Sequence, residues 1–269
     1  MCAHNKIHKI GRALLLSTAG VMIAGVLAPL LHAQSFIISQ NGKTVGKASL
    51  SLKQDANGLS SVSGAKIDMP DLKYSFSSNA VLDPSYTLRS AQLEGSVNGT
   101  KASVNAQQQG AQYLIRINAN SQVINTPLAV HPATVFFPDF DPGALQALLN
   151  LGAARNNRDI WALIPKQSGS ISVLSIATNR DERGTLDSQQ ITVHHFTVTT
   201  DSGKTELFAS PRNELLQAEW TDEGFALVRD RFVLTPPSKP TAPPPAAPPP
   251  QQGQPQQQGQ PQGQPQSQQ

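Results

Sequence analysis

The chain has 269 residues, enough for one medium domain with additional segments, because domains usually run about 100–200 residues. Charged residues make up 14% of the chain, below the roughly 25% typical of soluble domains, and the formal net charge is +3. Residues 1–33 carry three of the 21 basic residues and no acid, which leaves 18 basic and 18 acidic residues in the remainder. A neutral remainder without basic clusters argues against nucleic acid as a partner.

The N-terminal segment has the order of charge and hydropathy of a secretory signal peptide. Lys6, Lys9 and Arg12 precede the apolar run 13–31, and the small residue Ala33 stands before a polar stretch. We predict a signal peptide over residues 1–33 and export to the periplasm or the extracellular space. The alternative is an uncleaved anchor, because a 19-residue apolar run can span a bilayer. In that case the membrane is reached only through this segment.

The position of the one cysteine excludes several kinds of site from the rest of the chain. The sole cysteine is Cys2, inside the predicted signal peptide. The remainder therefore has no thiol for a disulfide, a catalytic nucleophile or a zinc site.

Residues 34–234 are predicted to form a β-rich globular domain. Turn pairs with a glycine recur at short intervals, and such pairs favour tight hairpins. They are Asn41-Gly42, Asn57-Gly58, Asn98-Gly99, Ser168-Gly169, Ser202-Gly203 and Glu223-Gly224. Apolar residues alternate with polar ones in the intervening segments, as in Ala48, Leu50 and Leu52, and residues 215–220 and 225–229 read as a final hairpin.

One helix interrupts this pattern. Asp141 suits an N-cap and Pro142 the first helical position, so a helix of about ten residues is predicted to end at Gly152. The preceding stretch 131–140 contains two prolines and three phenylalanines, and it is predicted to be an apolar loop or lid.

The fold class that follows is mainly β: an antiparallel curved sheet or partial barrel with one short helix. Closing or nearly closing the sheet protects its edges from aggregation. A sandwich of two sheets is the alternative, since periodicity does not separate the two.

Residues 235–269 are predicted to be a disordered Pro/Gln-rich tail. Twelve of the 21 prolines lie there, and large aliphatic and aromatic side chains are missing. Such a composition cannot bury enough apolar surface to offset chain entropy.

Acids and histidines offer little for catalysis or metal binding. Asp139 and Asp141 form a pair near His131, but Asp141 is better explained as a helix cap. His194 and His195 are adjacent on a predicted strand, so they point to opposite faces and cannot chelate one ion together. We therefore expect no enzymatic activity, no metal and no cofactor. A hydrolase that uses these acids or a histidine is the alternative.

Aromatic residues gather beside the predicted helix. Phe136, Phe137, Phe140 and Trp161 fall within 26 residues and could line a cavity for an apolar ligand. The alternative, which we favour, is that they form the core between helix and sheet.

The start of the predicted domain resembles known exported proteins. An apolar strand followed by Asn41-Gly42-Lys43-Thr44-Val45-Gly46 and an alternating strand is similar to the opening of bacterial exported families of unknown function. These resemble, in outline, the lipoprotein-localisation carriers, which implies a curved sheet around a hydrophobic cavity. The resemblance assigns no site residue.

The leading hypothesis is an exported, non-enzymatic protein that binds an apolar or lipid-like ligand or supports envelope assembly, with that ligand or an envelope protein as its partner. A second hypothesis is a surface interaction module presented on the Pro/Gln-rich tail.

Overall fold

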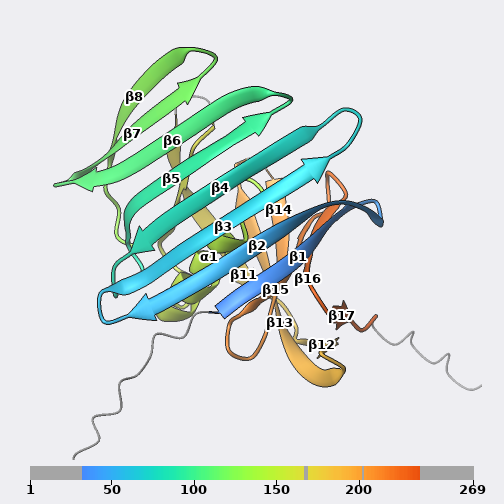
Figure 1. Ribbon diagram of the computed structural model, residues 1–269. Coiled ribbons are helices and arrows are strands. Elements are labelled where there is room, and N and C mark those ends of the chain that lie inside the picture. Colours follow the sequence, from blue (N-terminus) through green and yellow to red (C-terminus); the bar gives the residue numbers. More distant parts are fainter. Residues whose placement is uncertain (1–31, 167–168, 202, 237–269) are drawn as a thin grey trace, which may run out of the picture. The chain divides into compact units, whose positions relative to one another are not determined.

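The computed structural model describes residues 32–166, 169–201 and 203–236 (Figure 1). The chain divides into two units, Met1–Thr235 and Pro236–Gln269, and the fold described below belongs to the first. Most of the predicted signal peptide and of the predicted tail lies outside the described residues. The strands of the first half are β1 (His32–Gln40), β2 (Lys43–Asp55), β3 (Gly58–Asp68), β4 (Lys73–Leu82), β5 (Leu88–Val97), β6 (Thr100–Gln109), β7 (Gln112–Ala119) and β8 (Gln122–Ala129).

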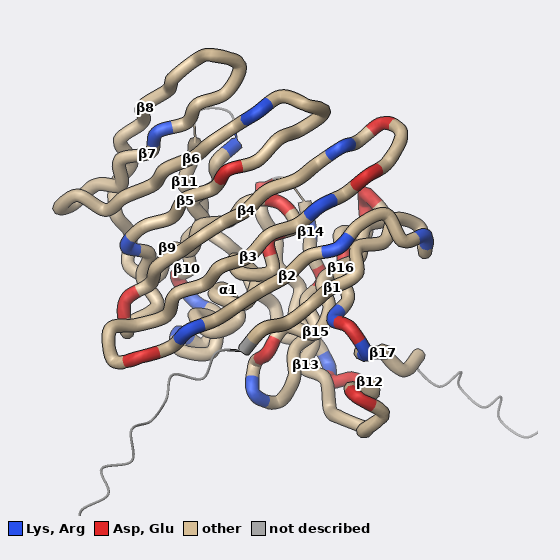
Figure 2. The backbone as a smooth tube through the Cα atoms, viewed as in Figure 1, with Lys and Arg blue, Asp and Glu red and all other residues tan. Residues whose placement is uncertain are grey.

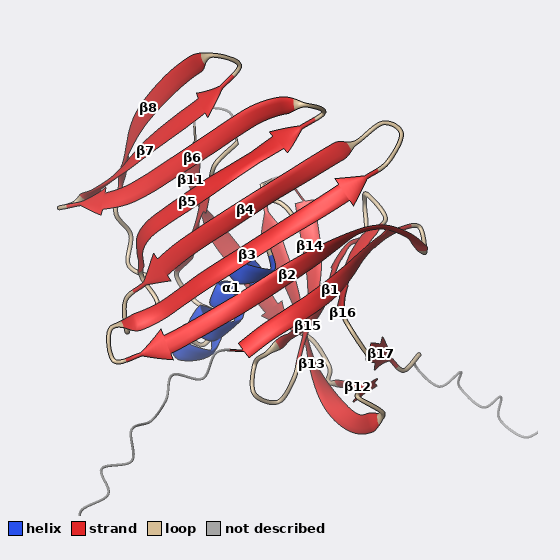
Figure 3. Cartoon of the chain, in the orientation of Figure 1, coloured by secondary structure: helices blue, strands red, loops and turns tan. Residues whose placement is uncertain are grey.

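The second half contains the helix and shorter strands. They are β9 (Thr134–Phe136), α1 (Pro142–Arg155), β10 (Ile160–Ile164), β11 (Ser170–Thr178), β12 (Glu182–Leu186), β13 (Gln189–Thr200), β14 (Gly203–Ala209), β15 (Leu215–Trp220), β16 (Phe225–Arg229) and β17 (Phe232–Leu234). The prediction of a mainly β fold with one helix is confirmed for the described residues (Figure 3).

The two halves belong to one continuous, mostly antiparallel sheet. Strands β1 to β8 pair in chain order, and β1 also pairs with β16, so the sheet continues through β15, β14, β13 and β11 to β10. Strand β9 adds to β10 in parallel. Because β9 also lies against β5, the sheet curls back on itself as a partial barrel rather than forming two separate sheets.

The hairpins at Asn41-Gly42 and Asn98-Gly99 form where the sequence predicts them, for a local reason. Ser168 and Ser202, which belong to two other predicted turns, lie outside the described residues. Asn41 and Gly42 have φ of 50° and 78°, and Asn98 and Gly99 have φ of 49° and 82°. Two successive positive φ values define the type I′ turn, whose twist matches that of the flanking strands. In the paired strands, alternate side chains then face the interior, as the burial pattern of β3 shows.

Helix α1 fills the interior of the curled sheet. It contacts β2 and β3 on one side and β9, β10 and β15 on the others, and it lies behind the long strands in Figure 1. Nearly all of its residues from Pro142 to Gly152 are buried. A helix that is apolar all round is stable only when it is enclosed in this way.

The helix is longer than the sequence predicts, and the prediction that Gly152 ends it is wrong. It has 14 residues and ends at Arg155. The C-cap Asn156 takes the left-handed conformation and donates its backbone N–H to the carbonyl of Gly152. Gly152 is needed for a close approach instead. A Cβ there would lie 2.5 Å from Oδ1 of Asn157.

A buried polar contact holds the other end of the helix against the sheet. Asp141 caps the helix as predicted: its carboxylate accepts the backbone N–H of Gly143 at 2.8 Å. The same oxygen accepts the hydroxyl of Ser63, on β3, at 2.5 Å. Asp141 is 3% exposed, and this burial raises its pKa because it disfavours the charged carboxylate.

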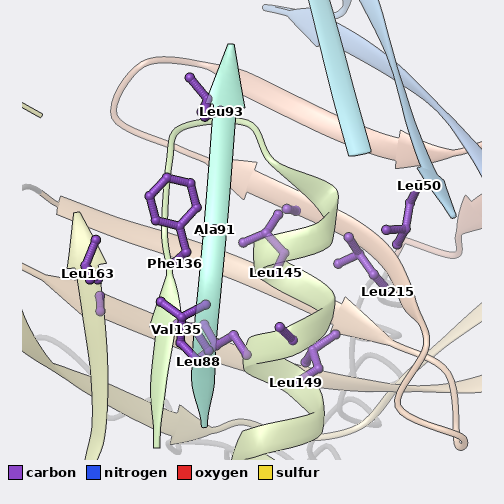
Figure 4. Close-up of a cluster of buried hydrophobic side chains, with 14 of the residues drawn as sticks. Leu50, Leu88, Ala91, Leu93, Val135, Phe136, Leu145, Leu149, Leu163 and Leu215 are labelled. Carbon is purple, nitrogen blue, oxygen red and sulfur yellow. The ribbon is translucent and has the colours of Figure 1, made fainter. Parts of the chain in front are cut away.

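The stretch that the sequence predicts to be a lid is part of the core instead. Thr134–Phe136 forms β9, all three residues are buried, and the two prolines flank the strand. Figure 4 shows Phe136 and Val135 packed between the strand of Leu163 and the strand of Ala91. A parallel pairing with β10, which the local sequence does not reveal, overrides the loop-like composition.

A second, smaller core lies apart from the main one. It consists of Val193, Phe208, Leu216 and Phe232. Strand β12 pairs with both β13 and β17 at this place, so the two short strands β12 and β17 cover this core.

Among the described residues, no helix is long and apolar enough to span a bilayer.

We expect the stability of Asp141→Asn relative to the wild type to depend on pH. Because the pKa of Asp141 is raised above 3.8 in the folded protein, the folded state binds this proton more tightly than the unfolded state. Its contribution to stability is fully present below pH 3.8 and is lost as the pH rises through the raised pKa. The wild-type advantage over Asp141→Asn in the free energy of unfolding should therefore decrease with rising pH.

Urea unfolding of both proteins at a series of pH values tests this expectation. All other titrating groups are common to the two proteins and cancel in the difference. A difference that is constant with pH, or that grows as the pH rises, would contradict the burial argument.

Candidate functional site

An apolar pocket lies at the C-terminal end of α1, and we call it the helix-end pocket. Its volume is about 140 Å³. Its lining comes from the helix, from β11, β13 and β14, and from the turn before β15. The lining residues are Leu148, Leu149, Gly152, Ala153, Asn156, Asn157, Ile176, Phe196, Val198, Leu207 and Asn213.

The walls and the polar groups of the pocket differ in chemistry. Aliphatic and aromatic side chains form the walls, whereas the polar lining consists of Asn156, Asn157 and Asn213. All three asparagines have positive φ, so each stands where the chain turns sharply. No charged side chain lines the pocket. An apolar cavity with a few polar groups is the usual design of a small-molecule site.

Buried hydrogen bonds fix the turn that closes the pocket. Gln146, which is 3% exposed on α1, donates from Nε2 to the carbonyl oxygen of Asn213 at 2.7 Å. Its Oε1 accepts the backbone N–H of Leu215 at 2.8 Å. On the opposite side, Nδ2 of Asn157 donates to the hydroxyl of Thr178 at 3.1 Å. The pocket is therefore preformed by contacts that do not involve a ligand.

Two larger hollows are less suited to an apolar ligand. They have volumes of about 640 and 620 Å³ and lie along strands of the first half of the sheet. Serine, glycine, alanine and lysine dominate their lining, as Ser49, Gly64 and Lys66 illustrate. They offer little enclosed apolar surface.

The four aromatic residues predicted from the sequence do not form one site. Phe136 is 3% exposed in the core. Trp161 stacks on His131 with ring centroids 3.7 Å apart. Phe137 lines a small cavity of about 60 Å³. None of these residues lines the helix-end pocket.

Phe140 belongs to a separate aromatic cluster. Its ring centroid lies 4.8 Å from that of Trp220, 4.9 Å from that of Phe225 and 6.0 Å from that of Tyr74. Its partners come from β4, β15 and β16, which are distant in sequence. This cluster packs strands against the segment before α1.

The two acids that the sequence suggests as a pair, Asp139 and Asp141, lie in different environments. Asp141 is the buried helix cap, whereas the carboxylate of Asp139 is half-exposed and forms an ion pair with Lys166 at 3.0 Å. Tyr74 donates its hydroxyl to the backbone carbonyl of Asp139 and not to the carboxylate. Burial raises the pKa of Tyr74. The two carboxylates therefore occupy different surroundings, and only Asp139 lines a described cavity.

The adjacent histidines have different carboxylate partners. His194 lies 3.0 Å from Asp181. His195 lies 3.0 Å from Glu182 and 2.9 Å from Glu206, and its ring stacks on Phe208. Both side chains are partly buried, and their separate partners agree with the prediction that adjacent strand residues point to opposite faces. In the part of the chain that the structure describes, no group of His, Cys, Asp and Glu is arranged to hold a metal ion.

Comparison with known proteins places the chain in a family. Residues 36–231 match the domain of unknown function DUF6134. The chain belongs to this family. No curated protein matches the sequence. Among solved structures, a crystal structure of a beta-barrel-like protein of the domain of unknown function DUF1849 from Brucella abortus is similar, with 7% identity and a TM-score of 0.49. The alignment covers 77% of this chain and 98% of the chain of the Brucella abortus protein.

Sequence reasoning missed the helix-end pocket in this DUF6134 domain. Its walls combine one helix end with strands 20 to 60 residues further along the chain, and no local pattern links them. The only sequence signal was the set of asparagines at 156, 157 and 213, which mark turns at its rim.

We expect Gln146→Leu to destabilise the protein by about 2–5 kcal/mol. The change leaves the carbonyl of Asn213 and the N–H of Leu215 without their partner, and an unpaired buried group costs about 1–3 kcal/mol. Chemical denaturation measures the difference. Asn150→Ala is the control, because it removes only a third contact of Gln146, at 3.1 Å, and should cost roughly 1 kcal/mol. Equal losses in the two variants would contradict the assigned role.

Proposed function

We propose that this domain binds an apolar or lipid-like ligand in the helix-end pocket, as an exported, non-enzymatic protein. The observation that carries the proposal is the pocket itself: preformed, apolar-walled and uncharged. A cavity of about 150 Å³ with apolar walls holds a molecule the size of benzene, so this pocket has room for one ring or the end of a hydrocarbon chain. Export is inferred from the sequence of residues 1–33.

Several features support binding over catalysis. The acids and histidines described above are engaged as a helix cap, in ion pairs or in a ring stack, and none lines this pocket. The pocket offers asparagine amides, which orient a ligand by hydrogen bonds but are poor proton donors and acceptors in general acid–base catalysis. The sequence resemblance to lipoprotein-localisation carriers points to the same class of ligand.

Native mass spectrometry of the protein purified from its own host, followed by solvent extraction, tests the proposal directly. We expect a stoichiometric apolar adduct. A bare polypeptide mass, together with no binding of added apolar compounds, would contradict the proposal.

We expect Ala153→Phe to abolish ligand binding without loss of stability. Ala153 lines the pocket at an exposed helical position, so a phenyl ring there would occupy the cavity without disturbing the buried core. Ala154→Phe is the matched control, because Ala154 is also exposed on the same helix turn but does not line the pocket. Adduct occupancy in native mass spectra and thermal unfolding measure the two effects. Equal occupancy in both variants would place the ligand elsewhere.

A further inference from the structure

The surroundings of the helix-end pocket carry an unusual set of arginines. Arg155 and Arg158 flank the lining residues Asn156 and Asn157, and Arg212 precedes the lining residue Asn213. Arg180 follows the end of β11. All four are exposed. We call Arg155, Arg158, Arg180 and Arg212 the arginine rim.

Hydrogen bonds hold the segments of the rim beside the same pocket. The backbone N–H groups of Asn156 and Asn157 both donate to the carbonyl of Gly152, which fixes the turn carrying Arg155 and Arg158. The bond from Asn157 to Thr178 brings the end of β11, two residues before Arg180, to this turn. The bond from Gln146 holds the turn that carries Arg212. Three separate chain segments that meet at the pocket therefore each carry at least one of these arginines.

The rim has no internal charge compensation. Among the described residues, none of the four arginines forms an ion pair, although most other arginines do: Arg89, Arg229 and Arg231 each contact a carboxylate. Of the neighbouring acids, Glu214 forms an ion pair with Arg229, whereas Asp181 lies 3.0 Å from His194, which is charged only when protonated. Asp181 and Asp159 therefore both count as negative charges beside the rim.

The helix end does not cancel this positive charge. A helix C-terminus carries the equivalent of about half a negative charge, and its effect falls off within the last turn. Four guanidinium groups against the carboxylates of Asp159 and Asp181 and half a charge from the helix end leave an excess of about one and a half positive charges. In the view of Figure 2, basic and acidic residues alternate along the strands of the sheet.

We propose that the ligand of the helix-end pocket is a single-chain amphiphile with an anionic head group. This inference rests on the proposed function and names the class of ligand. The hydrocarbon end lies between Leu149, Phe196 and Leu207, and the carboxylate or phosphate lies at the mouth among the arginines. Arginine suits this role because its planar fork binds both kinds of anion in a bidentate manner.

The pocket volume limits the length of the enclosed chain. About 140 Å³ is close to the volume that holds a six-carbon ring. A linear chain of roughly six to eight carbons therefore places its head group at the mouth. A diacyl lipid is too large to be enclosed.

Calorimetric titration of the full chain, freed of adducts, with three eight-carbon compounds tests the proposal. The compounds are octanoate, octanol and octylammonium, which share the chain and differ in head charge. We expect octanoate to bind about tenfold more tightly than octanol, and octylammonium to bind most weakly, because several exposed charge contacts each contribute modestly. The preference for octanoate should shrink at high salt. Octyl phosphate, compared with octanoate, separates the two anionic heads.

Substitutions of rim arginines test whether these residues cause the preference for octanoate over octanol. Arg158→Gln and Arg212→Gln should each weaken octanoate by roughly threefold and leave octanol unchanged. Arg116→Gln is the matched control, because Arg116 is also exposed and without an ion pair among the described residues, but lies on β7, which does not line the pocket. Inorganic phosphate alone should bind far more weakly than octyl phosphate, since it lacks the chain.

The outcomes separate this inference from the proposed function. If octanol and octylammonium bind as well as octanoate, and Ala153→Phe blocks all three, the anionic class is wrong and the apolar pocket stands. If none of the compounds binds, or if Ala153→Phe blocks none, both the inference and the proposed function are wrong.

Discussion

A curled sheet encloses a helix whose buried residues face all sides, and this enclosure is the constraint on which the structure depends. Leu145, Leu148 and Leu149 lie on one face of α1, Ala147 and Leu151 lie on the opposite face, and all five are buried. Fully burying a leucine side chain contributes about 1.5–3 kcal/mol, so no single flat sheet could satisfy this helix. The sheet must therefore surround it, which the pairing of β1 with β16 and the contact of β9 with β5 achieve.

Polar contacts then fix the position of the helix inside an otherwise apolar interior. Asp141 and Ser63 hold its start, Gln146 holds its middle, and Gly152 permits the close approach of Asn157 at its end. Each of these contacts joins the helix to a segment far away in the chain or to its own cap. Dispersion forces and the burial of apolar surface have no preferred direction. These hydrogen bonds therefore set the position of α1 along the sheet.

The helix-end pocket is a consequence of that position. The helix ends at Arg155, and β11, β13, β14 and the turn at Asn213 complete the lining of the pocket at that end. The same sharp turns that end the helix and reverse the chain also carry Arg155, Arg158 and Arg212. The pocket lining and the segments that carry these three arginines therefore arise from one local arrangement.

The sequence by itself determined the features that depend on neighbouring residues. The hairpins at Asn41-Gly42 and Asn98-Gly99 and the start of the helix at Asp141 follow from backbone conformation and capping, which act over two to four residues. Alternating hydropathy likewise predicted the antiparallel strands. Only the tertiary structure decided that residues 134–136 form a buried strand, that the helix continues past Gly152, and that Phe136, Phe140 and Trp161 lie in different surroundings. These outcomes depend on pairing and packing between segments that are distant in the chain, so no local pattern could have fixed them. The same holds for the helix-end pocket, whose walls come from α1, β11, β13 and β14.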